Sequence, residues 1–294
     1  MSLAISKCTN NNIKIIKKYF FPNSLGIFYH AMTQFLGFDN YGDEYKIMGM
    51  AAYGKPKYFD ILKNNLFLDN EKKLELNLNY FNHHKPNFRY IADENLIIDK
   101  IFNKKLSSLF KLEREKIIKN DTFSKDLAAS IQKVYEHFFE KIIIDISKLK
   151  YSENLVYAGG CGLNSSANRI ITDNKKYFKH TYIPFAPGDN GGALGAAFVV
   201  SSKYNNKIQN SNNPFLGKSY DNQYIKDILD KNLYNAKTNY KYIENEKEFF
   251  KIAAEMISQG NVIGWFQNKM EFGPRALGNR SILADPRNPN MKDI

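Results

Sequence analysis

Cysteine is scarce in this 294-residue sequence, and its placement excludes several kinds of site. The two cysteines, Cys8 and Cys161, are far apart and neither belongs to a C-x-x-C pair. Neither a disulfide framework nor a zinc knuckle is therefore expected. No apolar run approaches the roughly 18 residues that a membrane helix needs, and residues 1–12 are too polar for a signal peptide. We expect a cytoplasmic protein with no membrane partner.

Several motifs of nucleotide binding and catalysis are missing as well. The sequence holds no G-x-x-x-x-G-K-[ST], no G-x-S-x-G and no two histidines four residues apart. These gaps disfavour a P-loop, a serine-hydrolase elbow and a paired-histidine metal site on one helix. The run at 159–164, GGCGLN, also lacks the G-x-G-x-x-G spacing of a dinucleotide-binding turn.

Positive charge is abundant, but arginine supplies little of it. Lysine and arginine total 42 against 30 acids, a formal charge of +12. A basic balance can indicate a nucleic-acid partner, yet the lysines are scattered without a long basic run. We interpret them as a solvated surface and expect no nucleic-acid partner.

Three of the six arginines, Arg275, Arg280 and Arg287, lie within thirteen positions near the C-terminal end of the sequence. A guanidinium group binds phosphate or carboxylate bidentately, which lysine cannot do. The cluster therefore predicts an anion site. The alternative is that these arginines pair with Glu271 and Asp285 on a folded loop.

Hydrophobic periodicity predicts two main helices. Ser24 caps a helix at 25–36 that ends at Gly37, and Asp121 or Ser124 caps a helix at 121–148 that lines a core. Further expected elements are an edge strand at 13–20, a tightly packed helix at 43–54 and a helical insertion at 66–119, most clearly helical at 93–119.

A strand, a glycine turn and a helix then occur twice in succession. The first set is a buried strand at 154–158, a turn at 159–162 and a helix at 164–171; the second is 181–183, 187–192 and 193–201. This alternation predicts an α/β fold whose helices begin at anion-friendly turns. The first turn can also be a tight turn without a ligand. Asp189 in the second turn is either an N-cap or a carboxylate that holds a metal or faces a phosphate.

A second unit is expected after a linker. Residues 202–213 have little to bury, and a helix at 221–229, a strand at 240–243, a helix at 245–259 capped by Asn245 and a strand at 262–266 follow.

Seven blocks of the sequence together resemble the nodulation-protein and antibiotic-tailoring O-carbamoyltransferase family. They are residues 21–29, 36–38, 43–54, 126–132, 159–168, 188–197 and 264–293, of which FGPRALGNRS at 272–281 is the most specific. The resemblance implies an actin-like (ribonuclease H-like) ATPase-type domain at 1–203, incomplete, a linker at 204–217, and the start of a YrdC-like α/β domain at 218–294.

The resemblance also implies a reaction. Carbamoyl phosphate and ATP would form carbamoyladenylate, and the carbamoyl group would pass to a hydroxyl of a sugar or natural-product acceptor. A carbamoyl or threonylcarbamoyl transferase acting on tRNA or protein, and an inactive nucleotide-binding remnant, are the alternatives. A homodimer and complementing fragments are both compatible with the sequence.

The expected site residues follow from the same resemblance. We assign catalytic roles to Lys46 and Arg275, and a divalent metal, Fe(II), to Asp189. ATP is expected at Gly159, Gly160, Asn164, Gly191, Gly192, Arg275, Arg280 and Ser281. The family's H-x-x-x-H metal pair and the remainder of its YrdC-like domain are not found in the sequence. We therefore expect little or no carbamoyl transfer from this chain alone.

Overall fold

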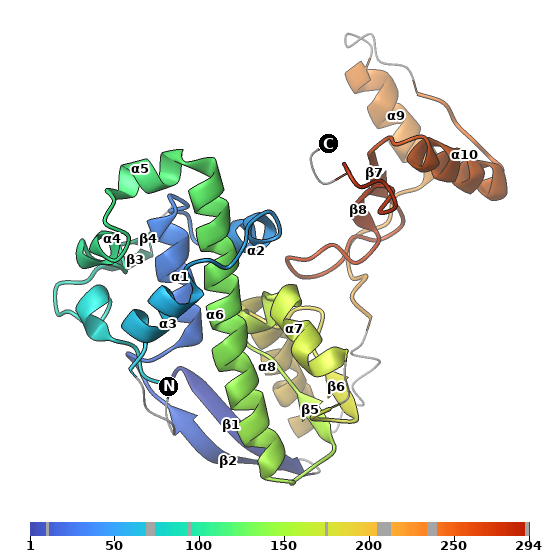
Figure 1. Cartoon of the computed structure of the whole chain (residues 1–294). Coiled ribbons are helices and arrows are strands. Elements are labelled where there is room, and N and C mark those ends of the chain that lie inside the picture. The colour runs from blue at the N-terminus through green and yellow to red at the C-terminus, as the bar shows by residue number, and fades with distance from the viewer. Residues whose placement is uncertain are drawn as a thin grey trace. The chain divides into compact units, whose positions relative to one another are not determined.

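The protein is described by a computed structural model that covers residues 1–9, 12–68, 74–92, 96–173, 176–204, 213–233, 240–291 and 294. These residues form two compact units, Met1–Ile183 and Pro184–Ile294 (Figure 1). The domain limits expected from the resemblance, 1–203 and 218–294, stay a prediction. Most of the expected linker at 204–217 lies outside the described residues.

A two-stranded antiparallel sheet opens the first unit. Strand β1 (Leu3–Thr9) pairs with β2 (Asn12–Tyr19), which confirms the edge strand expected at 13–20. The sequence analysis missed β1. Of the described residues of this hairpin, only Ile5 and Tyr19 are buried, and β1 carries no clear apolar alternation that could have revealed it.

Helix α1 (Leu25–Phe35) begins and ends as predicted. The Ser24 hydroxyl oxygen accepts a hydrogen bond from the Ile27 amide at 3.3 Å. Gly37 follows the helix with φ of +94°, a conformation that side chains disfavour, and its N–H donates to the Gln34 carbonyl.

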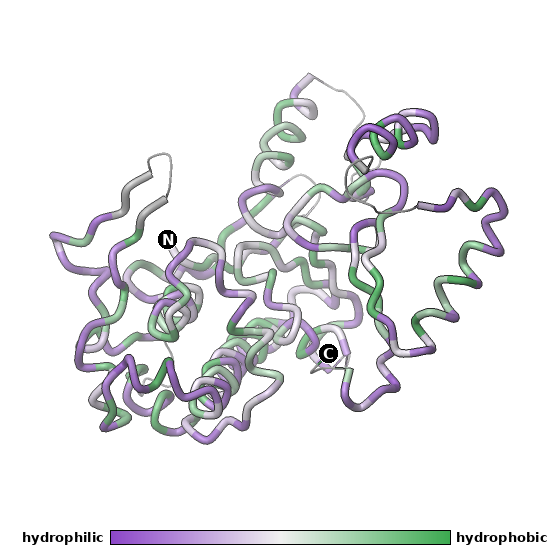
Figure 2. Tube along the Cα trace, turned by 90° about the horizontal axis from the view of Figure 1, so that it is seen from above, coloured by the Kyte–Doolittle hydropathy of each residue, from purple (hydrophilic) through white to green (hydrophobic). Residues whose placement is uncertain are grey.

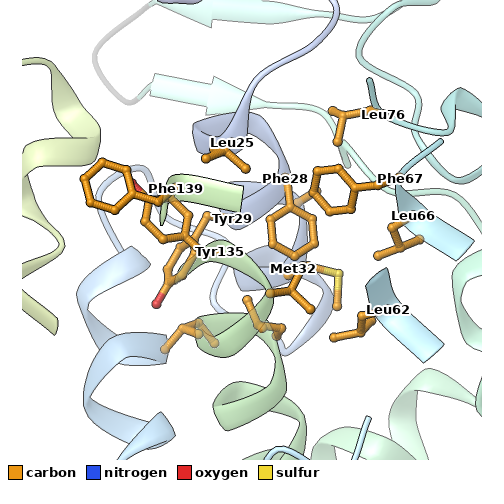
Figure 3. Packing of buried hydrophobic residues seen from close by; sticks show 14 of the residues in the cluster. Leu25, Phe28, Tyr29, Met32, Leu62, Leu66, Phe67, Leu76, Tyr135 and Phe139 are labelled. Atoms are coloured by element: carbon orange, nitrogen blue, oxygen red, sulfur yellow. The ribbon is translucent and has the colours of Figure 1, made fainter. Parts of the chain in front are cut away.

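The long helix α6 (Asp121–Lys148) runs through the first unit, and α1, α2 (Glu44–Ala51), α3 (Phe59–Leu66) and α5 (Arg114–Lys119) pack against it (Figure 1). Its predicted range is confirmed, but its cap is Asn120 instead of Asp121 or Ser124. Figure 3 shows the core that α1, α3 and α6 share, with Phe28, Met32, Leu62 and Leu66 among its fully buried members.

Gly54 lets the end of the α2 segment approach α6 closely. A methyl group on Gly54 would lie 1.9 Å from the Lys125 carbonyl oxygen, closer than any two such atoms can come. The close backbone approach expected for 43–54 is confirmed at this glycine.

The segment that follows α3 is less helical than predicted. It contains the 3-10 turn η1 (Leu78–Tyr80), the antiparallel strands β3 (Tyr90–Ala92) and β4 (Leu96–Ile98), and the short helices α4 (Lys105–Ser108) and α5. A continuous helix at 93–119 is therefore wrong. Tertiary contacts hold the chain extended here: the Gln34 side-chain oxygen accepts from the Ile101 amide at 2.8 Å.

The strand–turn–helix–strand unit is present. Strand β5 (Asn154–Val156) leads through η2 (Gly160–Leu163) and α7 (Ser165–Thr172) to β6 (His180–Tyr182), which pairs with β5 in parallel. A mixed α/β fold is confirmed. The expectation that the first strand is buried is wrong, since Val156 is 68% exposed. The actin-like and YrdC-like assignments stay predictions.

The second unit contains helices α8 (Asp189–Lys203), α9 (Asn222–Leu233) and α10 (Glu246–Ser258). Strand β7 (Ile263–Phe266) pairs antiparallel with β8 (Arg280–Leu283), which the sequence analysis missed. Asn245 caps α10 as predicted, accepting from the Lys247 and Glu248 amides. The strand expected at 240–243 is wrong: these residues are irregular, and among the described strands none pairs with them.

Apolar and polar residues are interspersed along the traced chain (Figure 2). Across the part of the chain that the structure describes, every helix is too short or too polar to cross a bilayer.

Candidate functional site

The first glycine turn is open at the positions expected to meet a ligand. Gly159 has φ of +111°, and a methyl group on Gly159 or Gly160 would touch nothing within 4 Å. The Gly162 amide donates to the Gly159 carbonyl at 2.8 Å and closes the turn. Open space at two exposed glycines permits a ligand to approach the backbone.

Asn164, which follows this turn, has its side chain engaged within the protein. Its Oδ1 caps α7 by accepting from the Ala167 amide at 3.1 Å. Its amide also exchanges hydrogen bonds with that of Gln132 on α6, each at 3.1 Å. Gln132 in turn accepts from the Tyr29 hydroxyl at 2.8 Å and donates to Glu136 at 2.9 Å. Asn164 thus fixes the turn to the helical core.

Cys161, in the same turn, is not set up as a nucleophile. Burial raises the pKa of its thiol, and the nearby Glu44 carboxylate raises it further. A thiol in this setting stays protonated at neutral pH.

Lys46 lies on α2 and is held by a neighbouring acid. Its Nζ is 2.8 Å from Asp43 Oδ1, and the ring of Phe38 lies 5.4 Å from it. The hydrogen bond to Asp43 raises the pKa of Lys46, so the side chain is an ammonium ion at neutral pH. It can supply positive charge, but it cannot act as a free-amine base without first losing that proton.

His30 and Glu44 form a pair that the sequence analysis did not find. His30 Nδ1 lies 2.5 Å from Glu44 Oε1, and the His30 side chain is 9% exposed. Burial of the Glu44 carboxyl favours its neutral form, but the contact with His30 outweighs this and its pKa is lowered. His30 and Glu44 are 14 residues apart on different helices, so no spacing rule could have joined them.

In the second unit, Asp189 starts helix α8 and is exposed. Gly191 packs tightly, because a methyl group there would lie 1.9 Å from the Ala186 carbonyl oxygen. Gly192 has nothing within 4 Å of the same position. Of the two glycines, Gly191 is required by packing and Gly192 borders open space.

Asp189 does not have the partners of a metal centre. Among the described residues, no group of three or more histidine, cysteine, aspartate or glutamate side chains could hold a metal ion. A single carboxylate does not hold Fe(II), which binds through several nitrogen and oxygen ligands. The residues described here therefore do not fit the expected iron.

The arginine loop, residues 271–280, lies in the connection from β7 to β8, ends at the first residue of β8 and is organised by a buried acid. The Glu271 side chain is fully buried, and its Oε1 accepts from the amides of Leu277 at 2.7 Å and Asn279 at 2.8 Å. Its Oε2 lies 3.2 Å from Arg280 Nε. Burial alone would raise the pKa of Glu271, but the backbone amides that donate to it prevail and the pKa is lowered.

Arg280 and Arg287 are paired with acids, as the alternative interpretation of the sequence expected. The Arg280 Nη2 donates to the Gly273 carbonyl while its Nε faces Glu271. Arg287 binds Asp285 through Nε at 2.8 Å and Nη2 at 2.7 Å, and this contact lowers the pKa of Asp285 to about 2. Arg275 is half-buried at the middle of the loop, and Ser281 is half-buried in β8 opposite Trp265.

The arginine loop lies against the segment that precedes α8. The rings of Phe272 and Phe185 are 6.3 Å apart, edge to face. A methyl group on Gly273, whose φ is +106°, would lie 3.1 Å from the Phe185 carbonyl oxygen. The structure thus brings together two stretches that the sequence analysis assigned to one ligand, the turn before α8 and the arginine loop.

These features define a mixed α/β protein with two glycine turns and an arginine-bearing loop that is held by a buried acid. Family models match in two places: "Carbamoyltransferase N-terminus" at residues 2–198 and "Carbamoyltransferase C-terminus" at 254–294. The chain belongs to the carbamoyltransferase family, which confirms the resemblance found in the sequence.

Three curated relatives illustrate the similarity. An uncharacterized protein of Synechocystis sp. is 39% identical over 93% of this chain and 43% of its own length. Nodulation protein NolO of Bradyrhizobium diazoefficiens is 31% identical over 92% of this chain and 45% of its own. Nodulation protein NolNO of Sinorhizobium fredii is 30% identical over 92% of this chain and 36% of its own. The chain spans less than half the length of each.

Proposed function

We propose that this chain takes part in O-carbamoyl transfer, in which carbamoyl phosphate and ATP give carbamoyladenylate and the carbamoyl group then passes to a hydroxyl of a sugar or other small molecule. The observation that carries the proposal is the family match at both ends of the chain, together with an arginine loop at the family's most specific block.

The chemistry requires stabilisation of leaving phosphates. Water cleaves carbamoyl phosphate to carbamate and phosphate, and carbamate displaces pyrophosphate from ATP to form the adenylate. The final transfer breaks the bond between the carbamoyl carbon and the oxygen of AMP as the acceptor oxygen attacks and gives up its proton to solvent. Negative charge grows on the departing oxygens in each step. A guanidinium group fixed in advance stabilises that charge without reorganising.

Arg275 is the residue proposed to contact the phosphates. Its loop neighbours are held by Glu271 and Arg280, so its backbone position is set before any ligand arrives. Gly192, which borders open space, would let a phosphate approach the backbone at the start of α8, and Ser281 would add a hydroxyl beside the loop.

The residues of the first unit have complementary proposed roles. Gly159 and Gly160 leave room for a nucleotide at the backbone, and Asn164 holds their turn in place. Lys46, as an ammonium ion, would supply a catalytic positive charge near a reacting anion. Because the described residues do not fit an iron site at Asp189, no step is assigned to a metal.

Binding titrations of the 294-residue chain test this function against its alternatives. We expect ATP and carbamoyl phosphate each to change the emission of Trp265, the one tryptophan of the sequence, and transfer RNA to show no retention at physiological salt. Salt-dependent retention of transfer RNA would favour carbamoylation of a nucleic acid. Binding of ATP with no response to carbamoyl phosphate would favour a nucleotide-binding remnant.

A further inference from the structure

The arginine loop contains two arginines, Arg275 and Arg280, and the contacts of Arg280 show how the loop is held. Both nitrogens of Arg280 for which contacts are described face inward: Nε toward Glu271 and Nη2 toward the Gly273 carbonyl. Arg275 lies between Gly273 and Leu277, two of the residues whose backbone this network contacts, and its own carbonyl accepts from Arg280 Nη2 at 3.5 Å.

Glu271 is the centre of the network. A fully buried carboxylate is costly unless it is paired and hydrogen-bonded. Glu271 Oε1 accepts from two amides on the far side of the loop, Leu277 and Asn279, and Oε2, which has no hydrogen-bond partner in the described structure, is paired only by charge with Arg280 Nε at 3.2 Å. The Asn279 side chain adds a bond to the Lys269 carbonyl at 2.8 Å, which ties the end of the loop to its beginning.

The loop needs this restraint because its backbone is unusual. Gly273 and Gly278 have φ of +106° and +110°, in a region that residues with side chains seldom occupy. Glycines are also the residues that lose most conformational freedom on ordering. An unrestrained 271–280 segment would therefore sample many conformations and would present Arg275 in few of them correctly.

We infer that Glu271 is a positioning residue, which holds the loop in the conformation that presents Arg275 to a phosphate, and that Arg280 acts through the same clamp without contacting the anion itself. This inference rests on the proposed function. It assigns Arg280 a different role from the phosphate contact that the sequence suggested.

A single substitution separates the two roles. In Glu271→Gln, one oxygen can still accept from the Leu277 and Asn279 amides, but an NH₂ replaces the oxygen that faces Arg280, so the ion pair is lost, the clamp is weakened and the Arg280 guanidinium is freed from Glu271. If Arg280 contacted the anion directly, releasing it would leave binding unchanged or tighten it. If Glu271 positions the loop, binding of ATP and of inorganic pyrophosphate weakens by about tenfold, the effect of losing one charge-assisted contact.

The experiment measures ATP and pyrophosphate affinity by calorimetry for the 294-residue chain and its Glu271→Gln, Arg280→Gln, doubly substituted and Arg275→Gln forms. Glu271→Gln and Arg280→Gln should each weaken binding about tenfold. The doubly substituted form should lose no more affinity than the weaker-binding of these two, because both substitutions act on one clamp. Asp285→Asn is the matched control. It removes a buried acid paired with an arginine outside the loop, and its affinity should be unchanged.

Trp265 emission and the thermal midpoint show whether each variant stays folded, since Trp265 pairs with Ser281 in the ladder beside the loop. If the Glu271→Gln variant does not fold, the Gly278→Ala variant is used in its place. A methyl group there meets nothing within 4 Å, so it strains the loop backbone without a clash, and Gly260→Ala applies a comparable strain outside the loop, at φ of +88°. Weaker binding only in Gly278→Ala supports positioning, and equal binding contradicts it.

Failure of this inference differs from failure of the proposed function. If Arg275→Gln weakens binding while Glu271→Gln binds equally or more tightly, positioning by Glu271 is wrong and the function stands. If Arg275→Gln binds like the unsubstituted chain, or if that chain binds neither ligand, both are wrong.

Discussion

The side-chain amides of Gln132 and Asn164 donate to each other, each at 3.1 Å, across the contact between α6 and α7. This exchange uses the Asn164 groups that a nucleotide would otherwise contact. Asn164 therefore supports the proposed site by fixing the turn that holds Gly159 and Gly160.

Replacing Asn164 tests that structural role. Asn164→Ala removes the cap of α7, at a cost of about 1 kcal/mol, and removes the bonds to the Gln132 amide, which keeps Tyr29 and Glu136 as partners, at a further cost of about 0.5–1.5 kcal/mol. Urea denaturation followed by circular dichroism should show both losses. Asn120→Ala, which removes only the cap of α6, is the control and should lose about 1 kcal/mol. Equal losses in the two variants would show that the amide exchange contributes nothing.

The close approach of the α2 segment to α6 gives a second prediction. Gly54→Ala places a methyl group 1.9 Å from the Lys125 carbonyl oxygen, so the two segments must separate at a cost of about 1–3 kcal/mol. Gly49→Ala is its counterpart, in α2 itself, with nothing within 4 Å. That change should be neutral or add up to about 1 kcal/mol of stability, because alanine favours helix. A thermal midpoint equally lowered in both would contradict the packing argument.

The two glycines at the start of α8 should respond differently to alanine. Gly191→Ala clashes with the Ala186 carbonyl oxygen and should lower the thermal midpoint. Gly192→Ala has room for its methyl group, so the fold should be retained, while ATP affinity should fall if a phosphate approaches the backbone there. Unchanged ATP affinity in folded Gly192→Ala would remove this glycine from the proposed site.

The burial of His83 predicts that the folded protein loses stability between neutral and mildly acidic pH. Burial lowers the pKa of His83 from its usual 6.5, although its Nε2 lies 2.9 Å from the Pro22 carbonyl and the contact opposes this. Its Nδ1 is buried with no hydrogen-bond partner in the described structure, so a proton added there is unfavourable. Above pH 6.5 the histidine is neutral in both states; below it, the unfolded chain takes up the proton more readily, and stability falls.

Urea denaturation at pH 7.5 and 5.5 measures this effect. The unsubstituted chain should lose stability at the lower pH, and His83→Gln should lose less. The exposed His180 serves for comparison, and His180→Gln should keep most of the pH dependence. An identical pH dependence in His83→Gln and the unsubstituted chain would show that His83 does not cause it.

The sequence predicted correctly those helices and caps that depend on residues close together in the chain. The 121–148 helix was predicted because apolar residues recur at helical spacing and face one core, and the caps Ser24 and Asn245 were predicted because capping depends on residues within one turn. The helix expected at 93–119 was wrong because Gln34, far away in sequence, binds the Ile101 amide and favours an extended chain.

The candidate site was likewise predictable only in part. The sequence predicted the glycine turns and the arginine cluster, but it did not determine which groups the arginines pair with. Glu271 reaches Leu277 and Asn279 only because Gly273 and Gly278 turn the loop back, a geometry that spacing does not encode. The His30–Glu44 pair depends on how α1 and α2 pack, so sequence alone could not reveal it.

The central claim is that Arg275 binds the phosphates of the carbamoyl donor and nucleotide. Its most direct test is calorimetric titration of ATP and carbamoyl phosphate into the chain and into Arg275→Ala, with both proteins shown to be folded by Trp265 emission. We predict an affinity at least about tenfold weaker in Arg275→Ala, the consequence of losing one charge-assisted contact of about 1.5–3 kcal/mol. Equal affinities in the two proteins would contradict it.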